Sequence, residues 1–236
     1  MLSNATREII ERFWATELGC PIEALRQPGI SVVPRYQRGA FFLQIGHSLV
    51  FSVPELSMKR VEETVELTSA MECFDAAGIA ELLGPSVTLI LGPCPIGYLE
   101  STMLRVPEES TARRLMPKDA GAVEQLSAEC GREAWEHGGV EFGVHEAVFG
   151  AFTDVRLVAA ASFERWGNVI AHVGVVTAPG HRGMGFGKAT AAAATQHALG
   201  VGLLPQWRTL ASNHTAISVG KALGFEMVAT HYFARM

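Results

Sequence analysis

The stretch Val175-Val-Thr-Ala-Pro-Gly-His-Arg-Gly-Met-Gly-Phe-Gly-Lys-Ala189 decides the fold of this chain. Its β-branched residues predict a strand that stops at Pro179, and the alanine-rich sequence after it predicts a helix over about 185–199. Glycines at 183, 185 and 187 lie between the two. The pattern therefore predicts a strand, a glycine-rich turn and a helix in immediate succession.

This turn has the chemistry of a phosphate site. Glycine adopts backbone angles that other residues resist and lets a ligand come close to the main chain. The first N–H groups of a helix have no partner inside the helix and lie at the positive end of its dipole. An anion binds well at such a position. Arg182 and Lys188 add a positive charge on either side of the turn.

Two common phosphate motifs do not fit these residues. The dinucleotide fingerprint GxGxxG needs a third glycine where Lys188 stands, and it needs an acidic residue about 20 positions further on. No acidic residue occurs there. The P-loop motif ends in Gly-Lys-Ser/Thr, whereas Gly187-Lys188 is followed by Ala189. Lys188 therefore excludes the dinucleotide fingerprint, and Ala189 excludes the P-loop motif.

The charge pattern also favours a polyanionic ligand. The chain has a formal net charge of −5, yet no Asp or Glu occurs from Arg165 to Phe225. The same window holds five bases, which are Arg165, Arg182, Lys188, Arg208 and Lys221. A ligand with a diphosphate and a further ribose phosphate would account for this local positive potential. The alternative is that an Ala/Gly-rich helix and buried strands simply carry few charges.

Two motifs in this region resemble one protein family. Arg182-Gly-Met-Gly-Phe-Gly187 is similar to the R/Q-x-x-G-x-G/A signature of the GCN5-related N-acetyltransferase (GNAT) superfamily. The later stretch Asn213-His-Thr-Ala-Ile-Ser-Val-Gly-Lys-Ala-Leu-Gly-Phe225 resembles the family's Asn-x-x-Ala/Ser segment ending in Leu-Gly-Phe. The motifs have the family's order and separation, and the resemblance covers about residues 112–236.

The resemblance implies acetyl-CoA as co-substrate and assigns its binding residues. The pantetheine arm would pair with the strand backbone at Val175, Val176 and Thr177. Asn213 would hydrogen-bond the arm near the thioester, or it is a helix N-cap, or both. The diphosphate would be held by main-chain N–H groups of the turn, with Lys188 next to it: Arg182, Gly183, Met184, Gly185, Phe186 and Gly187.

The catalytic residues are less well defined by the resemblance. The family's reaction is direct attack of an amine on the acyl thioester, without a metal. A tyrosine that many members use as acid is Gly220 here, and a glutamate that some use as base is Ala171. The candidates that remain are Glu164, His172 and Tyr232, and each could equally be a structural residue. A chain that binds acyl-CoA as a sensor or interaction module, with the chemistry lost, is the alternative function.

The fold expected for the second segment is a mixed α/β arrangement of the GNAT type. The pattern predicts a strand at 112–116, a helix from 117–119 to about 135, and an antiparallel meander of strands at 146–153, 156–164 and 169–177. The glycine-turn helix follows, and the segment ends in a strand around 207–210, a helix at 214–223 and a strand at 225–234. The sequence RWGN predicts a tight hairpin turn between the last two meander strands.

The first segment lacks any chemical motif, and we expect a smaller mixed α/β domain. A helix that includes residues 9–18, strands at 29–35, 40–53 and 86–92, and helices at 59–68 and 75–83 are predicted. The polar stretch Pro107–Thr111 marks the boundary between domains 1–108 and 109–236. This first domain could form a wall of the acceptor site or the surface of a homodimer.

Composition narrows the partners and the compartment. The acidic net charge argues against a nucleic-acid partner, and no apolar run is long enough to span a membrane or act as a signal core. We therefore expect a cytoplasmic protein whose four separated cysteines are reduced thiols, and no metal site. The acceptor is a small-molecule or peptide amine. Acids between 129 and 164 could attract a cationic amine, or they lie on solvated surfaces.

Overall fold

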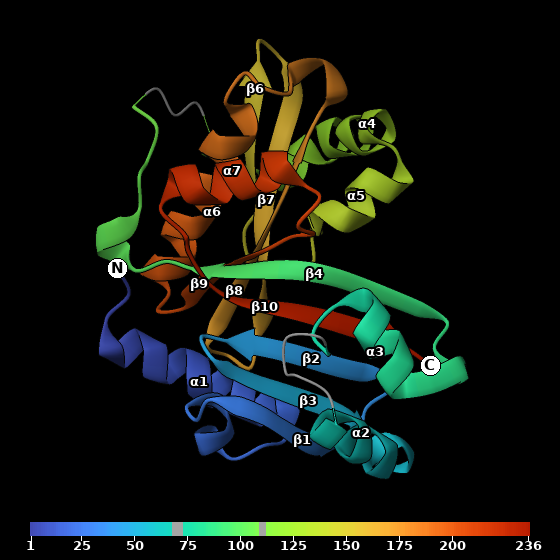
Figure 1. The fold of residues 1–236 in the computed structure, drawn as a ribbon. Coiled ribbons are helices and arrows are strands. Elements are labelled where there is room, and N and C mark those ends of the chain that lie inside the picture. Colours follow the sequence, from blue (N-terminus) through green and yellow to red (C-terminus); the bar gives the residue numbers. More distant parts are fainter. Residues whose placement is uncertain (68–72, 109–111) are drawn as a thin grey trace. The chain divides into compact units, whose positions relative to one another are not determined.

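The computed structural model describes residues 1–67, 73–108 and 112–236, and its chain divides into two compact units. The C-terminal unit comprises Met1, Tyr98–Trp207 and Ser218–Glu226; the N-terminal unit comprises Leu2–Gly97, Arg208–Ile217 and Met227–Met236. The first boundary between the two compact units lies at Gly97–Tyr98, whereas the sequence predicts it at 107–111. Residues 109–111 of that predicted boundary lie outside the described residues. Each unit is described by itself (Figure 1).

A mixed sheet forms the centre of the N-terminal unit, in the order β1-β3-β2-β10-β4. β1 is parallel to β3, whereas β2 is antiparallel to both β3 and β10. The strand expected over 40–53 is wrong in one respect, because Gly46 and His47 form a hairpin turn that divides it into β2 and β3. The strands are β1 (Gly29–Arg35), β2 (Ala40–Ile45), β3 (Ser48–Pro54), β4 (Leu89–Tyr98) and β10 (Glu226–Arg235).

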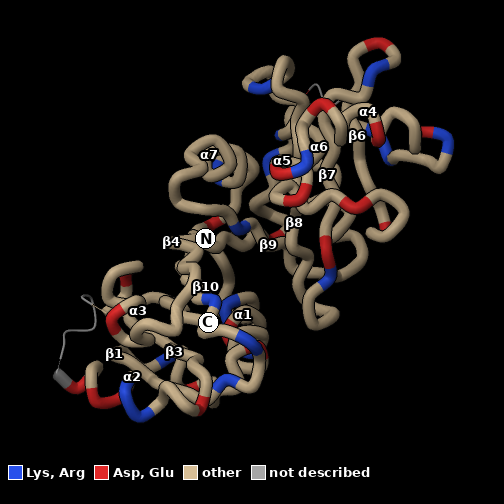
Figure 2. The backbone as a smooth tube through the Cα atoms, turned by 90° about the vertical axis from the view of Figure 1, so that its right-hand side faces the viewer, with Lys and Arg blue, Asp and Glu red and all other residues tan. Residues whose placement is uncertain are grey.

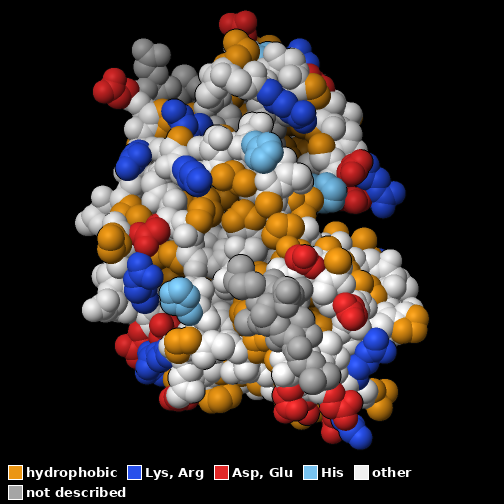
Figure 3. Space-filling model, in the orientation of Figure 1, with side chains coloured by type: hydrophobic (Ala, Val, Ile, Leu, Met, Phe, Trp, Pro, Cys, Tyr) orange, Lys and Arg blue, Asp and Glu red, His pale blue; other side chains and the backbone are white. Residues whose placement is uncertain are grey.

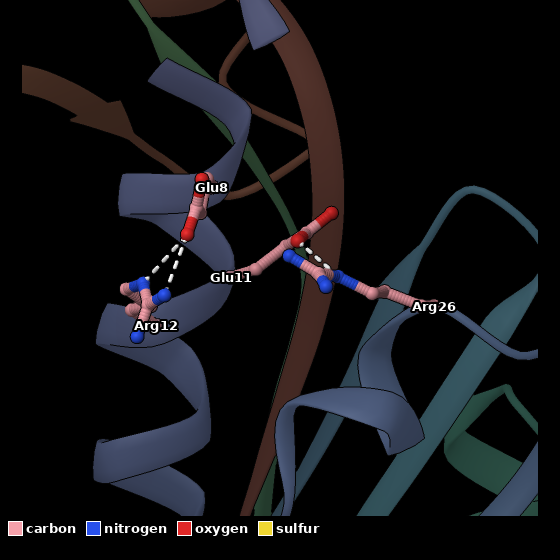
Figure 4. Close-up of polar contacts among 4 residues, drawn as sticks. All are labelled: Glu8, Glu11, Arg12 and Arg26. Carbon is pink, nitrogen blue, oxygen red and sulfur yellow. Dashed lines mark hydrogen bonds and ion pairs between the residues drawn. The ribbon is translucent and has the colours of Figure 1, made fainter. Parts of the chain in front are cut away.

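Three α-helices accompany this sheet: α1 (Asn4–Leu18), α2 (Glu55–Leu67) and α3 (Ala76–Leu83). Ser3 caps α1 and Asp75 caps α3, each accepting a hydrogen bond from a first-turn backbone N–H. On α1, Glu8 pairs with Arg12, and Glu11 pairs with Arg26, the residue that follows the next 3-10 helix (Figure 4). The buried core combines residues of the sheet with residues of α2 and α3, including Phe42, Phe51, Val61, Ile79, Leu82 and Tyr232.

A second run of strands, in the order β9-β8-β7-β6-β5, forms the sheet of the C-terminal unit. β6, β7 and β8 are consecutive antiparallel strands, which confirms the predicted meander. Gly167 and Asn168 both have φ of 55° in the turn of RWGN, as a tight hairpin requires. The strands are β5 (Arg113–Arg114), β6 (Phe149–Thr153), β7 (Arg156–Trp166), β8 (Ile170–Thr177) and β9 (Leu204–Arg208).

The α-helices after Tyr98 are α4 (Ala120–Cys130), α5 (Arg132–Gly138), α6 (Phe186–Gly200) and α7 (His214–Leu223). The single helix expected up to about 135 is wrong, because Gly131 adopts φ of +79° and separates α4 from α5. Short 3-10 helices complete the described chain: η1 (Ile22–Leu25), η2 (Gly84–Ser86), η3 (Ser101–Met103), η4 (Pro117–Asp119) and η5 (Pro179–His181).

Alternate residues of β8 face different helices. Val176 lies against Gly138 at the end of α5, whereas Val175 and Thr177 face Gly187 in the first turn of α6. The sheet of the C-terminal unit thus has an α5 face and an α6 face. The mixed α/β class is as expected. Within the described ranges, none of the helices has the length and apolar character that crossing a bilayer requires.

Candidate cofactor and catalytic site

The glycine turn leads directly from β8 into α6. Gly183 and Gly185 have φ of +78° and +90°, a left-handed conformation that side chains disfavour. A Cβ built on either glycine would meet no atom within 4 Å, so the turn is open on its outer side. The first turn of α6 contains no acidic residue. The open space beside the glycines, the positive end of the helix dipole and the lack of acidic residues all leave the N-terminus of α6 available to an anion.

Gly187 has a different reason for being glycine. A Cβ at this position would lie 2.6 Å from Oγ1 of Thr177. Because glycine has no Cβ, α6 can pack closely on the end of β8. On the exposed loop, Nε of Arg182 donates a hydrogen bond of 3.3 Å to the carbonyl of Thr177. The loop is thereby anchored to the strand that precedes it, and the Arg182 side chain is held beside the open glycines.

The strands β8 and β9 are paired over only part of the length of β8. Their parallel register runs from Ile170–Leu204 to His172–Gln206, and β8 continues to Thr177. On its other side β8 pairs with β7 along its whole length. The end of this pairing, the fork, therefore leaves one edge of Val173–Thr177 without a partner in β9. Val175, Val176 and Thr177, the residues expected to pair with a pantetheine arm, lie on this edge.

Glu164 and His172 are direct neighbours across the β7–β8 ladder. Their Cα atoms are paired in the antiparallel register, so both side chains leave the same face of the sheet. This is the α5 face, because Gly174 and Val176 follow His172 at intervals of two. Trp166 stacks on the imidazole of His172 with a centroid distance of 4.6 Å. The structure brings these two candidates together at the fork.

A second histidine lies on the same face, and the sequence did not single it out. Nδ1 of His145, in the loop after α5, lies 2.7 Å from Oγ of Ser162. Ser162 is fully buried and pairs with Gly174 across β7 and β8. Strand alternation with Glu164 could have indicated Ser162, but His145 lies in an irregular loop that carries no periodicity.

Trp207 explains the glycine at position 220. A Cβ on Gly220 would lie 2.8 Å from Cδ1 and 3.0 Å from Nε1 of Trp207, so the indole fills the space that a side chain would occupy. Trp207 is 3% exposed, and its Nε1 has no hydrogen-bond partner among the residues the structure describes. A side chain larger than glycine at position 220 on α7 would therefore clash with Trp207 on β9.

Asn213 and Tyr232 belong to the N-terminal unit. Oδ1 of Asn213 accepts a hydrogen bond of 3.0 Å from the backbone N–H of Ala216, which is the geometry of an N-cap for α7. Tyr232 is 5% exposed within the core around Phe74, and burial raises the pKa of its phenol. This environment fits a structural tyrosine better than a proton donor.

Several of the acids between 129 and 164 are neutralised by arginines of the same unit. Glu129 pairs with Arg156 at 2.5 Å, and Glu136 with Arg132 at 2.7 Å. Arg165, and to a smaller extent His197, lower the pKa of the Glu146 carboxyl. Such pairs favour solvated surfaces over an acidic wall for a cationic amine.

The last helix, α7, carries little charge. Only Lys221 is charged in α7, which is drawn almost entirely tan in Figure 2. Lys and Arg side chains are visible among hydrophobic ones on the part of the C-terminal unit shown at the top of Figure 3.

Three of the four cysteine thiols lie in surroundings that favour the protonated form. Burial raises the pKa of Cys20, Cys94 and Cys130, and no described group of side chains has the arrangement of a metal site. A thiol with a raised pKa is a poor nucleophile at neutral pH. Direct attack on a thioester needs no such group.

Comparison with known proteins identifies the class of the second segment. Residues 115–225 match the model of the acetyltransferase (GNAT) family. Residues 115–225 are thus similar to a GNAT acetyltransferase domain, a family that carries out acyl transfer. A search of curated proteins finds no match.

Solved structures agree on the fold. A GCN5-related N-acetyltransferase from Kribbella flavida is 21% identical, covers 94% of this chain and 95% of its own, and superposes with a TM-score of 0.56. A GNAT-family acetyltransferase from Colwellia psychrerythraea is 16% identical, covers 79% and 76%, and gives 0.54. At these identities the likeness establishes a shared fold.

Proposed function

We propose that this protein is an N-acyltransferase that moves an acetyl group from acetyl-CoA to an amine of a small molecule or peptide. The observation that carries the proposal is the open glycine turn at the N-terminus of α6, which directly follows the unpaired edge of β8. A diphosphate and an extended, amide-bearing arm need these two features in this order. The GNAT family match supports the same reaction class.

Two groups of residues in the C-terminal unit would bind acetyl-CoA. Main-chain N–H groups from Arg182 to Gly187 would hold the diphosphate, with Lys188 beside them. The free edge of β8 at Val175, Val176 and Thr177 would hydrogen-bond the amides of the pantetheine arm. On the family resemblance alone, Asn213, already an N-cap, would be a further partner of the arm through its NH2 group.

The acceptor amine must lose a proton as the acyl group is transferred. Glu164 and His172 are suited to this step, because they share the α5 face at the point where β8 and β9 separate. Either carboxylate or neutral imidazole can accept a proton directly or through a water molecule. We propose a primary amine as acceptor, and reduced thiols make the cytoplasm the compartment that we favour.

Calorimetric titration with acetyl-CoA tests the cofactor site. Gly185→Val should raise the Kd at least about tenfold, because a side chain at φ of +90° distorts the turn and removes hydrogen bonds to a charged group. Gly180→Ala is the matched control, since a Cβ there meets no atom within 4 Å and φ is ordinary. Equal affinity of Gly185→Val and wild type would show that the diphosphate binds elsewhere.

A catalytically silent acyl-CoA sensor is the second candidate function. It is favoured by Gly220, which cannot supply the acid that a tyrosine would supply at that position. Thiol release from acetyl-CoA in the presence of polyamines, aminoglycosides, amino acids and peptides separates the two functions. Release that depends on an amine supports the enzyme, whereas tight binding without release with any of these amines supports the sensor.

A further inference from the structure

His145 and Ser162 form a hydrogen-bonded pair on the α5 face that the cofactor site does not account for. Nδ1 of His145 lies 2.7 Å from Oγ of Ser162, which is 0% exposed. Oγ of Ser162 in turn lies 3.5 Å from the carbonyl oxygen of Gly139. The His145 ring is partly exposed, and its Nε2 has no hydrogen-bond partner in the described part of the chain.

The contacts allow two tautomers of the imidazole. With the proton on Nδ1, His145 donates to Oγ of Ser162 at 2.7 Å, and the hydroxyl can donate to the carbonyl of Gly139 at 3.5 Å. With the proton on Nε2, Nδ1 accepts from the Ser162 hydroxyl and, at 3.4 Å, from the Glu141 N–H. Only the first tautomer leaves a lone pair on Nε2, the nitrogen without a partner in the described part of the chain, so a base at Nε2 requires it.

The pair lies over the part of β8 that borders the fork. Ser162 is directly opposite Gly174, one residue beyond Val173, where the unpaired edge begins. A Cβ on Gly174 would clash with the carbonyls of Gly138 and Gly139, so the loop that carries His145 starts in direct contact with this strand. Glu164 and His172 are the next pair along the same face.

We propose that His145, with its proton on Nδ1, is the proton acceptor for the amine in place of Glu164 or His172, and that Ser162 is its positioning residue; this rests on the proposed acyltransferase function. As the amine nitrogen bonds to the acyl carbon, the carbon–sulfur bond breaks and its electron pair leaves with sulfur. The proton lost by nitrogen goes to Nε2 of His145. The imidazolium then passes that proton, through water, to the thiolate, so that the products are an amide and a free thiol.

The test uses the full chain, acetyl-CoA and the amine that gives the fastest thiol release. His145→Ala should lower kcat about 10²- to 10⁴-fold and leave the Kd for acetyl-CoA unchanged. Added imidazole should restore part of the lost rate. His137→Ala, on an exposed residue at the end of α5, is the matched control and should keep the wild-type kcat.

Ser162→Ala tests the positioning role by a different readout. Nitrogen-15 NMR of the imidazole should show the Nδ1–H tautomer in the wild type and a shift toward Nε2–H in the variant. Its kcat should fall while KM for the amine changes little. A wild-type kcat in His145→Ala, or a loss of rate in Glu164→Gln that far exceeds the loss in His145→Ala, would overturn this inference alone; an inability of the wild type to bind acetyl-CoA would overturn the proposed function itself.

Discussion

Single residues in the C-terminal unit show two different reasons for glycine. Gly185 is required by its backbone angle, and the space beside it is open, whereas Gly220 has an ordinary helical φ and no room for a Cβ. A sequence motif does not distinguish these cases. The first can be read from a glycine-rich turn before a helix, but the second depends on Trp207, which comes from another element.

Gly220→Ala should destabilise the protein by about 1–3 kcal/mol, because the added methyl group overpacks against Trp207. Urea denaturation at neutral pH measures the free energy of unfolding. Gly121→Ala in α4 is the control; its Cβ meets no atom within 4 Å, so it should be neutral or stabilising by up to about 1 kcal/mol. Equal stability of Gly220→Ala and wild type would show that the indole does not fill this space.

The catalytic residues could be predicted only in part. Alternation along 156–164 and 169–177 is enough to place Glu164 and His172 on strands, but the register that pairs them is a property of the folded hairpin. His145 carries no periodic pattern, and only its contact with the buried Ser162 identifies it. The cofactor residues were easier to find, because the turn and the helix that form the site are adjacent in sequence.

At the level of elements, the sequence predicted which segments are strands and helices better than where they end. The predicted strand ended at residue 92 because Pro93 and Pro95 are poor strand residues, but β4 continues to Tyr98. β9 begins at Leu204 rather than at 207. The division of α4 from α5 was missed because a lone glycine within a helical pattern does not by itself indicate a break.

The junction between β5 and α4 is held by one carboxylate. Asp119 accepts hydrogen bonds of 2.8 Å from both terminal nitrogens of Arg113 and one of 2.7 Å from the backbone N–H of Met116. Arg113 is the largest cause of the strongly lowered pKa of Asp119. The ionised carboxylate of Asp119 is therefore more stable in the folded state than in the unfolded state.

Asp119→Asn should lower the free energy of unfolding by about 1–3 kcal/mol at pH 7. The lowered folded-state pKa gives stability that is fully present above the ordinary pKa of 3.8 and is lost as pH falls below it. The difference between wild type and variant should thus shrink below about pH 4. Denaturation at pH 7, 5 and 3 measures it, and a difference independent of pH would contradict this account.

Glu136→Gln provides the control for that series. Its partner Arg132 is 90% exposed, and such surface pairs contribute less than about 1 kcal/mol. The variant should therefore unfold like the wild type at all three pH values.

At the scale of the whole molecule, the chain does not divide into an N-terminal half and a C-terminal half. β10, at the end of the sequence, lies between β2 and β4 in sheet order, and its Tyr232 and Ala234 belong to the core of the N-terminal unit. The sequence predicted a strand at 225–234 but assigned it to the second domain. Strand order depends on long-range pairing, which local pattern does not determine.

The fragment 1–97 should not fold cooperatively, because without β10 the strand β2 loses one of its two antiparallel partners and the core loses two buried side chains. Circular dichroism and urea unfolding test this expectation. The same fragment followed by a flexible linker and residues 226–236 should recover a cooperative transition. A sigmoidal unfolding curve for 1–97 alone would refute the prediction.

The packing of Trp207 on Gly220 also has an evolutionary consequence. The indole of Trp207 fills the space that a side chain at position 220 would need, so the residues at positions 207 and 220 cannot change independently. Relatives with tyrosine at the position of Gly220 should carry a smaller residue at the position of Trp207, and relatives that keep the tryptophan should keep the glycine. An ancestor that exchanged one state for the other would have passed through a small residue at both positions.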